Sequence, residues 1–224
     1  MEYFVFKGIN SSDLGIIVKE MPPVTKSEKN IESISISGRN GSLHVDDGTY
    51  KSKKYKIKCI LMDLTRINDL KLLFDGTGLL ELSTENNKEY KATLLNQIDF
   101  SKYLNYLKEF TLNFELDPIA YSKNEVELTI TENSTFSVGG NFETNPKLII
   151  NGVGTITLNN TPIAVEETGI TVDCDLMNCT KNGINMNNKV NIDSEFPKVI
   201  PGDNSVVIGN GIESVIIKYR EGWL

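Results

Sequence analysis

Residues 54–61 read Lys-Tyr-Lys-Ile-Lys-Cys-Ile-Leu, so lysine alternates with apolar side chains over this stretch. Successive side chains of an extended strand point to opposite faces, which places the lysines on one face and most apolar side chains on the other. The pattern predicts a β-strand with one solvated and one buried face. The same alternation recurs at residues 31–36, 79–82, 90–98 and 110–116, and it predicts that the first half is mostly sheet.

One segment of the first half has a helical pattern instead. Its apolar side chains recur three or four residues apart, at Ile67, Leu70, Leu73 and Phe74. Thr65 can cap the start of such a helix, and Gly76 stands where a left-handed terminator belongs. The pattern predicts a single helix of about two to three turns, at about residues 65–75.

The second half consists of short stretches with strand character separated by turn residues. The predicted strands are residues 126–131, 147–150, 154–158, 161–165, 169–173, 205–209 and 214–219. The turn signals between them are Gly139-Gly140, Asn159-Asn160, Asn182-Gly183 and Gly202-Asp203-Asn204. This spacing is typical of a jelly-roll or a related β-sandwich of about 100 residues.

A change in composition near residue 120 predicts two domains. Residues 1–120 contain 16 basic and 17 acidic side chains, whereas residues 121–224 contain 7 and 13. The second half also holds ten of the 17 glycines. We therefore expect a domain at residues 1–120 and a second at residues 121–224.

The overall composition is that of an ordinary globular protein and excludes several function classes. The chain has 224 residues and a formal net charge of −7, which argues against general nucleic-acid binding. No apolar run is long enough to span a membrane, and the first ten residues lack a signal-peptide pattern. Three cysteines suit free thiols in a reducing compartment. We expect synthesis in a cytoplasm and no membrane association.

The candidate reactive groups are few, and each has a simpler structural interpretation. His44, the only histidine, precedes Asp46-Asp47-Gly48, but the run lacks the ligand pattern of a zinc or EF-hand site, so turn chemistry is favoured. Cys174 and Cys179 are spaced too widely for a zinc knuckle, and we place Cys174 in a strand and Cys179 in the following loop. The sequence predicts no metal site.

The basic run at residues 51–58 is compatible with two kinds of surface, and the sequence holds no recognised catalytic motif. Alternating lysines are what a solvated strand face requires, although they could also meet an acidic partner surface. No Gly-x-Gly-x-x-Gly, P-loop or nucleophile elbow occurs. We therefore predict no catalytic residues, no cofactor and no enzymatic activity.

Several ordered phrases of the sequence resemble siphophage distal tail proteins. In the first half they are residues 4–16, Ser37-Gly38-Arg39-Asn40-Gly41-Ser42-Leu43, residues 46–50, residues 72–83 and Tyr90-Lys91-Ala92. In the second half they are residues 145–152 and 196–204. The phrases cover nearly the whole chain, and their order makes the resemblance more specific than any one of them. The chain resembles the short form of this family, without inserted carbohydrate-binding modules.

The resemblance implies an architecture and a role. It implies an N-terminal split β-barrel with one helix, which forms a ring, followed by a galectin-like β-sandwich of jelly-roll type. It further implies a hexameric hub, as a single or stacked ring, in the baseplate of a phage, prophage or tail-like bacteriocin. The hub would join the tail tube protein to the tail-associated protein and to the receptor-binding or fibre proteins. Phage DNA would pass through its lumen without specific binding, and the chain would be a virion component assembled in the bacterial host cytoplasm.

Arg39 and Asn40 are the candidate inter-subunit contacts. The glycines of Gly38-Arg39-Asn40-Gly41, or the asparagine, can supply positive φ for a tight turn that directs Arg39 outward. An exposed arginine can form an ion pair with a neighbouring subunit, although a solvated turn arginine fits the pattern as well.

Two other functions remain open at this level. A monomeric lectin-like carbohydrate-binding module would share the sandwich architecture, and Trp223 would be its first candidate for stacking on sugar. A small hydrolase that uses unrecognised carboxylates is the third hypothesis.

Overall fold

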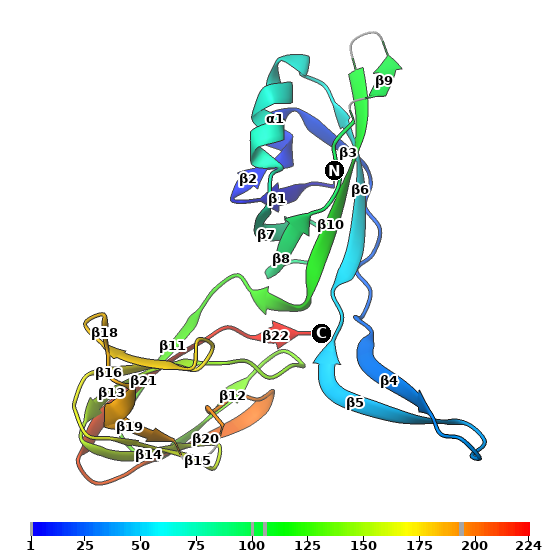
Figure 1. Ribbon diagram of the computed structural model, residues 1–224. Coiled ribbons are helices and arrows are strands. Elements are labelled where there is room, and N and C mark those ends of the chain that lie inside the picture. The colour runs from blue at the N-terminus through cyan, green and yellow to red at the C-terminus, as the bar shows by residue number, and fades with distance from the viewer. Residues whose placement is uncertain (1, 100, 105–106, 193–194) are drawn as a thin grey trace. The chain divides into compact units, whose positions relative to one another are not determined.

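The computed structural model describes residues 2–99, 101–104, 107–192 and 195–224. These residues fold into two compact units, Met1–Ala120 with Leu224, and Tyr121–Trp223. Each unit is built mainly of β-strands, which confirms the predicted fold class (Figure 1).

The first unit contains one curled sheet and a separate hairpin (Figure 1). Its strands are β1 (Phe4–Phe6), β2 (Ile9–Asn10), β3 (Ile16–Glu20), β4 (Lys29–Ser35), β5 (Ser42–Tyr50), β6 (Lys53–Leu61), β7 (Thr77–Leu82), β8 (Lys88–Leu94), β9 (Ser101–Leu104) and β10 (Leu107–Ser122). The curled sheet has the order β2-β1-β7-β8-β10-β6-β3, and β9 pairs with β10. Among the described strands, β4 and β5 pair only with each other.

Strand β6 has the two faces that its sequence predicts. Tyr55, Ile57, Cys59 and Leu61 are buried, whereas Lys54 and Lys56, on either side of Tyr55, are exposed. The partner strand β10 runs antiparallel and places its buried Phe114, Leu112 and Phe110 opposite the first three of these residues, whereas Leu61 lies opposite Lys108. The two strands therefore bury one shared face, as the alternation requires.

The helix occupies the predicted segment but begins differently. A 3₁₀ turn, η2 (Leu64–Arg66), leads into α1 (Ile67–Leu73). Thr65 is not the cap, because the Asp63 carboxylate precedes it and accepts hydrogen bonds from both the backbone N–H (3.0 Å) and the hydroxyl of Thr65 (2.6 Å). Gly76 has a φ of +69°, as expected for a left-handed residue after the helix.

Aromatic rings join α1 to the sheet. The ring of Phe74, just after the helix, lies 6.2 Å from that of Phe4, 6.1 Å from that of Phe6 and 6.5 Å from that of Phe110. Phe6 also contacts Phe114, with ring centroids 5.1 Å apart. All five rings are at least 96% buried, so this cluster is the centre of the core of the first unit.

The second unit is a sandwich of two sheets. Its strands are β11 (Val126–Ile130), β12 (Ser134–Val138), β13 (Lys147–Gly152), β14 (Gly154–Leu158), β15 (Thr161–Val165), β16 (Ile170–Asp173), β17 (Asn178–Lys181), β18 (Ile184–Asn185), β19 (Val190–Ile192), β20 (Gly202–Ile208) and β21 (Ile212–Tyr219). The last strand, β22 (Gly222–Trp223), belongs to neither sheet of the sandwich. One sheet has the order β11-β21-β13-β16-β17-β18 and the other β12-β20-β14-β15-β19. The described residues also include two short 3₁₀ turns, η1 (Ser11–Leu14) in the first unit and η3 (Asn187–Lys189) in the second.

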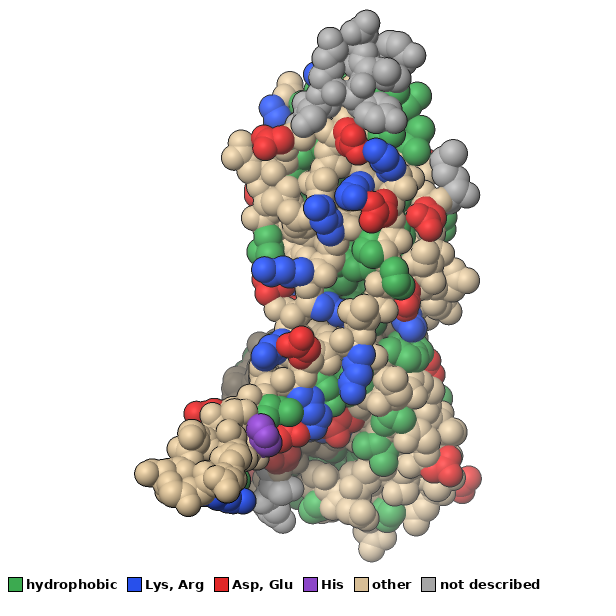
Figure 2. Space-filling view, turned by 90° about the vertical axis from the view of Figure 1, so that its right-hand side faces the viewer, with side chains coloured by type: hydrophobic (Ala, Val, Ile, Leu, Met, Phe, Trp, Pro, Cys, Tyr) green, Lys and Arg blue, Asp and Glu red, His purple; other side chains and the backbone are tan. Residues whose placement is uncertain are grey.

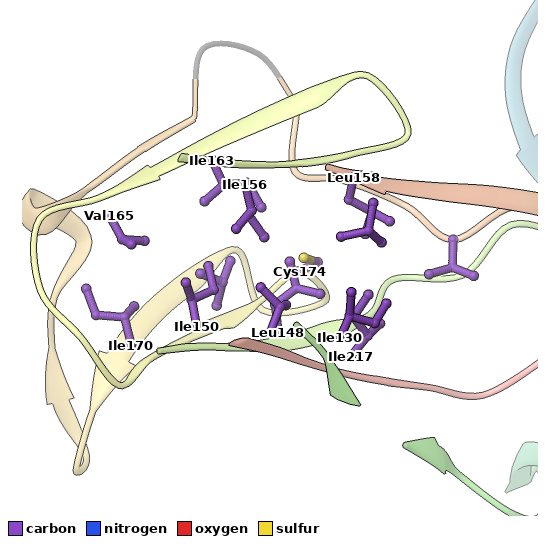
Figure 3. Packing of buried hydrophobic residues seen from close by; sticks show 14 of the residues in the cluster. Ile130, Leu148, Ile150, Ile156, Leu158, Ile163, Val165, Ile170, Cys174 and Ile217 are labelled. Atoms are coloured by element: carbon purple, nitrogen blue, oxygen red, sulfur yellow. The ribbon is translucent and has the colours of Figure 1, made fainter. Parts of the chain in front are cut away.

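The core of the second unit lies between its two sheets. Figure 3 shows Ile156, Leu158 and Ile163 from one sheet facing Leu148, Ile150 and Ile217 from the other. All of these side chains are at least 99% buried. Burial of this kind stabilises a sandwich because each sheet contributes one apolar face.

The predicted turn signals of this unit have different outcomes. Asn159 and Asn160 have φ of +48° and +68° and connect β14 to β15, as a two-residue hairpin turn requires. The turn predicted at Gly202-Asp203-Asn204 is wrong, because these residues pair with β12 as part of β20. The buried Asn204 side chain instead bonds to the Ile200 backbone, which shapes the chain just before the strand.

Candidate functional site

Among the elements of the first unit whose burial is described, the hairpin of β4 and β5 is the most exposed, and it carries both candidate contact residues. Gly38 and Gly41 have φ of +82° and +84°, so the two glycines, and not Asn40, supply the positive φ of the turn. The Arg39 N–H donates to the Ile36 carbonyl at 3.1 Å. Arg39 and Asn40 therefore lie at the tip of the hairpin, and both are exposed.

The hairpin has an apolar face and a polar face. Strand pairing places Ile34 opposite Leu43 and Glu32 opposite Val45, so Ile34, Leu43 and Val45 share one face. Ile36 follows two positions after Ile34 in the same alternation. These four side chains, which we call the hairpin face, are 40–44% exposed. The sequence predicted that residues 31–36 would have a buried face, and that prediction is wrong for this chain by itself.

A bulge and an ion pair shape the base of the hairpin. The Lys29 amine lies 2.5 Å from the Asp46 carboxylate, and its charge lies 5.8 Å from the centre of the Tyr50 ring. The Asp46 carboxylate accepts from the N–H of Gly48 at 2.9 Å, and Gly48 has a φ of +78°. The turn predicted at Asp46-Asp47-Gly48 is therefore wrong. The strand continues through a bulge, which lets Lys29 pair with Tyr50 after Ile31 pairs with Asp46.

The hairpin base is expected to loosen in acid. The hydrogen bond from Lys29, and then that from Gly48, lower the pKa of Asp46 below its usual 3.8. Because the folded pKa is the lower one, the carboxylate stabilises the hairpin above about pH 3.8, and this contribution is lost as the pH falls through the folded pKa. The Gly48 amide resonance in NMR spectra should report a midpoint below 3.8 in the native chain.

The control for this titration is Asp46→Asn, which keeps an acceptor oxygen but has no charge to lose. Its Gly48 resonance should not follow a carboxyl titration at this site. A midpoint at or above 3.8 in the native chain would contradict the role assigned to the Lys29–Asp46 pair.

His44 lies in β5 and not in the turn that the sequence favoured. Its side chain is exposed, and its Nδ1 lies 2.9 Å from the Ser33 hydroxyl across the hairpin. Within residues 2–99, 101–104, 107–192 and 195–224, no group of three or more histidine, cysteine or acidic side chains is arranged to hold a metal ion. The environment of His44 is thus that of a polar cross-strand pair.

The two cysteines of the second unit lie opposite to their predicted placement. Cys174 follows the end of β16, and Cys179 lies within β17. Both are buried and free. Burial, followed by the charge of Asp173, raises the pKa of Cys174 to about 12, and burial also raises the pKa of Cys179. Neither thiol has the low pKa of a reactive cysteine.

The lysines of the basic run belong to a face of mixed charge. The Lys58 amine lies 2.5 Å from the Glu20 carboxylate. The Lys53 amine donates to the Thr25 carbonyl at 3.1 Å and lies over the Tyr90 ring, and burial lowers its pKa. Figure 2 shows basic and acidic side chains interleaved over the upper part of the view. This surface lacks the uniform positive charge that nucleic-acid binding uses.

The second unit does not present the flat aromatic platform of a sugar-binding module. Its aromatic side chains are all described, and each is either buried or only partly exposed: Tyr121, Phe136, Phe142, Phe196, Tyr219 and Trp223. The Phe136 ring, for example, packs against the Tyr219 ring with centroids 5.8 Å apart.

In the described part of the chain, no helix has the length and apolar character needed to cross a membrane.

A comparison with protein-family models and a comparison with solved structures each found a match to this chain. Residues 163–223 match the family model described as "Siphovirus-type tail component, C-terminal domain". The whole chain is similar in structure to the Dit protein (gp 19.1) of phage SPP1, with a TM-score of 0.78, 17% sequence identity and 100% coverage of both chains. The crystal structure of that protein is described as a paradigm of the hub adsorption apparatus in phages that infect Gram-positive bacteria. No curated protein matches the chain at a significant level. The resemblance that the sequence phrases carry is confirmed.

Proposed function

We propose that this chain, a siphovirus-type tail component with the fold of a distal tail protein, is the hub at the end of a phage tail. The observation that carries the proposal is the full-length likeness in fold to SPP1 Dit, together with the family match of residues 163–223. The role is structural, in keeping with the absence of catalytic motifs in the sequence and of a reactive thiol among the cysteines.

Six copies form a closed ring in this proposal, and residues 1–120 carry the ring contacts. A ring uses head-to-tail contacts, so each subunit presents two different surfaces. Arg39 and Asn40, at the exposed tip of the hairpin, are the proposed contacts with the next subunit. Closure also covers the free strand edges of the hairpin, which would otherwise favour aggregation.

The hub joins the tail tube protein to the tail-associated protein and to the receptor-binding or fibre proteins. Six chains of charge −7 carry a formal charge of −42, which repels DNA and suits passage through a lumen without specific binding. The proposed location is the tail tip of the virion, after synthesis in the bacterial host cytoplasm.

Residues 121–224 form the galectin-like sandwich, to which we assign docking of the partner proteins. A lectin-like function for this domain is the weaker alternative, since its aromatic rings are buried or only partly exposed.

The oligomeric state of the purified chain tests the proposal. Light scattering should give a mass of six or twelve chains, about 150 or 300 kDa from a chain mass of 25.0 kDa. Electron microscopy should show a ring with a central hole, and antibodies against the chain should label tail tips. Arg39→Glu should weaken the ring, so that rings of the variant dissociate at a higher protein concentration than native rings. A chain that is monomeric in solution and absent from tails would contradict the proposed function.

A further inference from the structure

Strand β12 is the least protected edge of the sandwich in the second unit. Four described strands form the edges, β11 and β18 in one sheet and β12 and β19 in the other. Strands β18 and β19 have only two and three residues, and β11 carries Glu127, whose carboxylate lies 2.7 Å from the Lys218 amine. Strand β12 has five residues without charge or proline, and it pairs with β20 without a bulge. It therefore lacks the features by which proteins commonly protect a free edge from further pairing.

The pairing of β20 shows which backbone groups of β12 are free. Ser205 in β20 bonds away from β12: its N–H donates to the Asn159 side chain and its carbonyl accepts from the Asn159 N–H, both at 3.0 Å. Opposite residues of an antiparallel pair alternate between bonded and non-bonded pairs, so Thr135, opposite Ser205, does not bond to β20. Ser137 follows two positions later in the same alternation. Both residues direct their N–H and C=O groups away from β20, and no described residue bonds to these groups.

The next outward N–H along the chain is already satisfied. Gly139 donates its N–H to the Glu221 carboxylate at 3.0 Å, which closes this end of the free edge. Two N–H and two C=O groups thus remain for an added strand, which would replace their bonds to water by regular bonds of a sheet.

The inner face of β12 also offers apolar surface to an added strand. Phe136 is only partly buried, although its ring packs against that of Tyr219. Val126 of β11, opposite Tyr219, is partly exposed as well. The core therefore remains open to solvent along this side of the sandwich. A segment paired with β12 would place a side chain beside Phe136 and cover part of its ring.

The charge around β12 indicates the chemistry of that segment. Residues 124–146, which include β11 and β12, contain four glutamates and no basic residue. Two of these glutamates are offset by lysines from outside the segment. Glu132, just before β12, and Asp203, opposite Ser137 on β20, are exposed and form no ion pair with a described residue. The free edge is therefore acidic, and it favours a basic segment over an acidic one.

We propose that β12 is a docking strand, with which an extended basic segment of another tail protein pairs to add a sixth strand to the sheet. This inference rests on the proposed function, in which the sandwich docks the partner proteins. The segment alternates apolar side chains, which lie beside Phe136, with polar or basic ones on the face of Thr135 and Ser137. Main-chain hydrogen bonds supply affinity, and the alternate side chains supply specificity.

Hydrogen exchange of the native chain tests whether the edge is occupied. In the purified chain, the amides of Thr135 and Ser137 should exchange fast. In purified tails both should exchange at least about tenfold more slowly, so that a peptide covering residues 131–140 takes up about two fewer deuterons at short labelling times. Unchanged rates in tails that contain the native chain would overturn the inference and leave the proposed hub intact. Equal protection in the purified chain alone would assign the edge to a second copy and overturn the choice of partner.

Ser137→Pro blocks the added strand, and Ser137→Ala is its matched control. Proline removes the outward N–H and places its ring at the free edge without removing a bond to β20, whereas alanine keeps the N–H. Each chain is expressed with the other tail proteins and recovered through a tag. Mass spectrometry should show that the proline chain loses at least one tail protein that the native and alanine chains retain. In tails of the proline chain, the Thr135 amide should exchange at the rate of the purified chain.

The outcomes separate the docking strand from the hub itself. Retention of all tail proteins by the proline chain, with a protected Thr135 amide, would overturn the inference alone. Absence of the native chain from tails would contradict the proposed function and the inference with it. The exchange of the native chain decides the inference even where proline at position 137 lowers the melting temperature.

Discussion

Replacing Phe6 by alanine is expected to lower the free energy of unfolding of the first unit by about 3–5 kcal/mol. The Phe6 side chain is fully buried and touches rings from two other elements, Phe74 after α1 and Phe114 in β10. Alanine would leave a cavity between Phe74 and Phe114, and to close it β1 or β10 would have to shift against the strands with which it pairs. The melting temperature of this unit should fall by more than about 10 °C.

Differential scanning calorimetry measures this change, and Leu72→Ala is the control. Leu72 lies on α1 but is 80% exposed, so its truncation removes little buried area, and alanine favours helix. Its melting transition should stay within about 2 °C of the native one. Equal effects of the two substitutions would mean that the aromatic cluster does not hold the helix on the sheet.

The alternation of apolar and polar residues predicted most strands, because the apolar residues of each strand indicate which of its faces is buried. Strand β6 shows this well, since every second residue from Tyr55 to Leu61 is buried. The helix was found for the same reason, because Leu70 and Phe74 are four residues apart and both are buried. Its cap was misplaced because Asp63 and Thr65 can both cap a helix. Only the geometry shows that the Asp63 carboxylate accepts the bonds.

The hairpin of β4 and β5 shows what the alternation of residues along a strand does not predict. Ile34 and Ile36 alternate with serine as in a half-buried strand, and no feature of the alternation says which surface covers the apolar side chains. In the isolated chain they remain exposed. The alternation therefore identifies the strand but not whether the chain itself covers the apolar face of that strand. The candidate contacts Arg39 and Asn40 came from turn chemistry and family resemblance, and the apolar face beside them was missed.

The cysteines and the bulge of β5 were misjudged for a different reason. Asp46-Asp47-Gly48 has the composition of a turn, but Gly48 adopts its positive φ within a continuous strand. A glycine and two aspartates fit either structure, and the choice depends on the opposing strand, which local sequence does not specify. Cys174 and Cys179 were likewise assigned by spacing, although the ends of β16 and β17 are set by their pairing.

Replacing Gly211 by alanine is expected to destabilise the second unit by about 3 kcal/mol or more. Gly211 has a φ of +87°, and a Cβ atom there would lie 2.1 Å from the Val153 carbonyl oxygen. The Val153 N–H in turn donates to the Gly211 carbonyl at 2.9 Å. The substitution therefore adds backbone strain and forces apart two segments that are hydrogen-bonded to each other. The melting temperature of the unit should fall by more than about 10 °C.

Gly183→Ala separates the two causes of this effect. Gly183 has a similar φ of +79°, but a Cβ atom there would meet nothing within 4 Å. Its cost should be the backbone strain alone, about 1–2 kcal/mol. The extra loss at Gly211 then measures close approach between the turn from β13 to β14 and the turn from β20 to β21.

These two turns connect the same pair of sheets, because β13 and β21 lie in one sheet and β14 and β20 in the other. Their contact closes one end of the sandwich, and glycine at the contact point allows the backbones to meet. Calorimetry of the two variants measures how much each substitution lowers the melting temperature of the second unit. Equal shifts for Gly211→Ala and Gly183→Ala would show that the turns can move apart freely. A larger shift at Gly211 would show that the sandwich depends on their close approach.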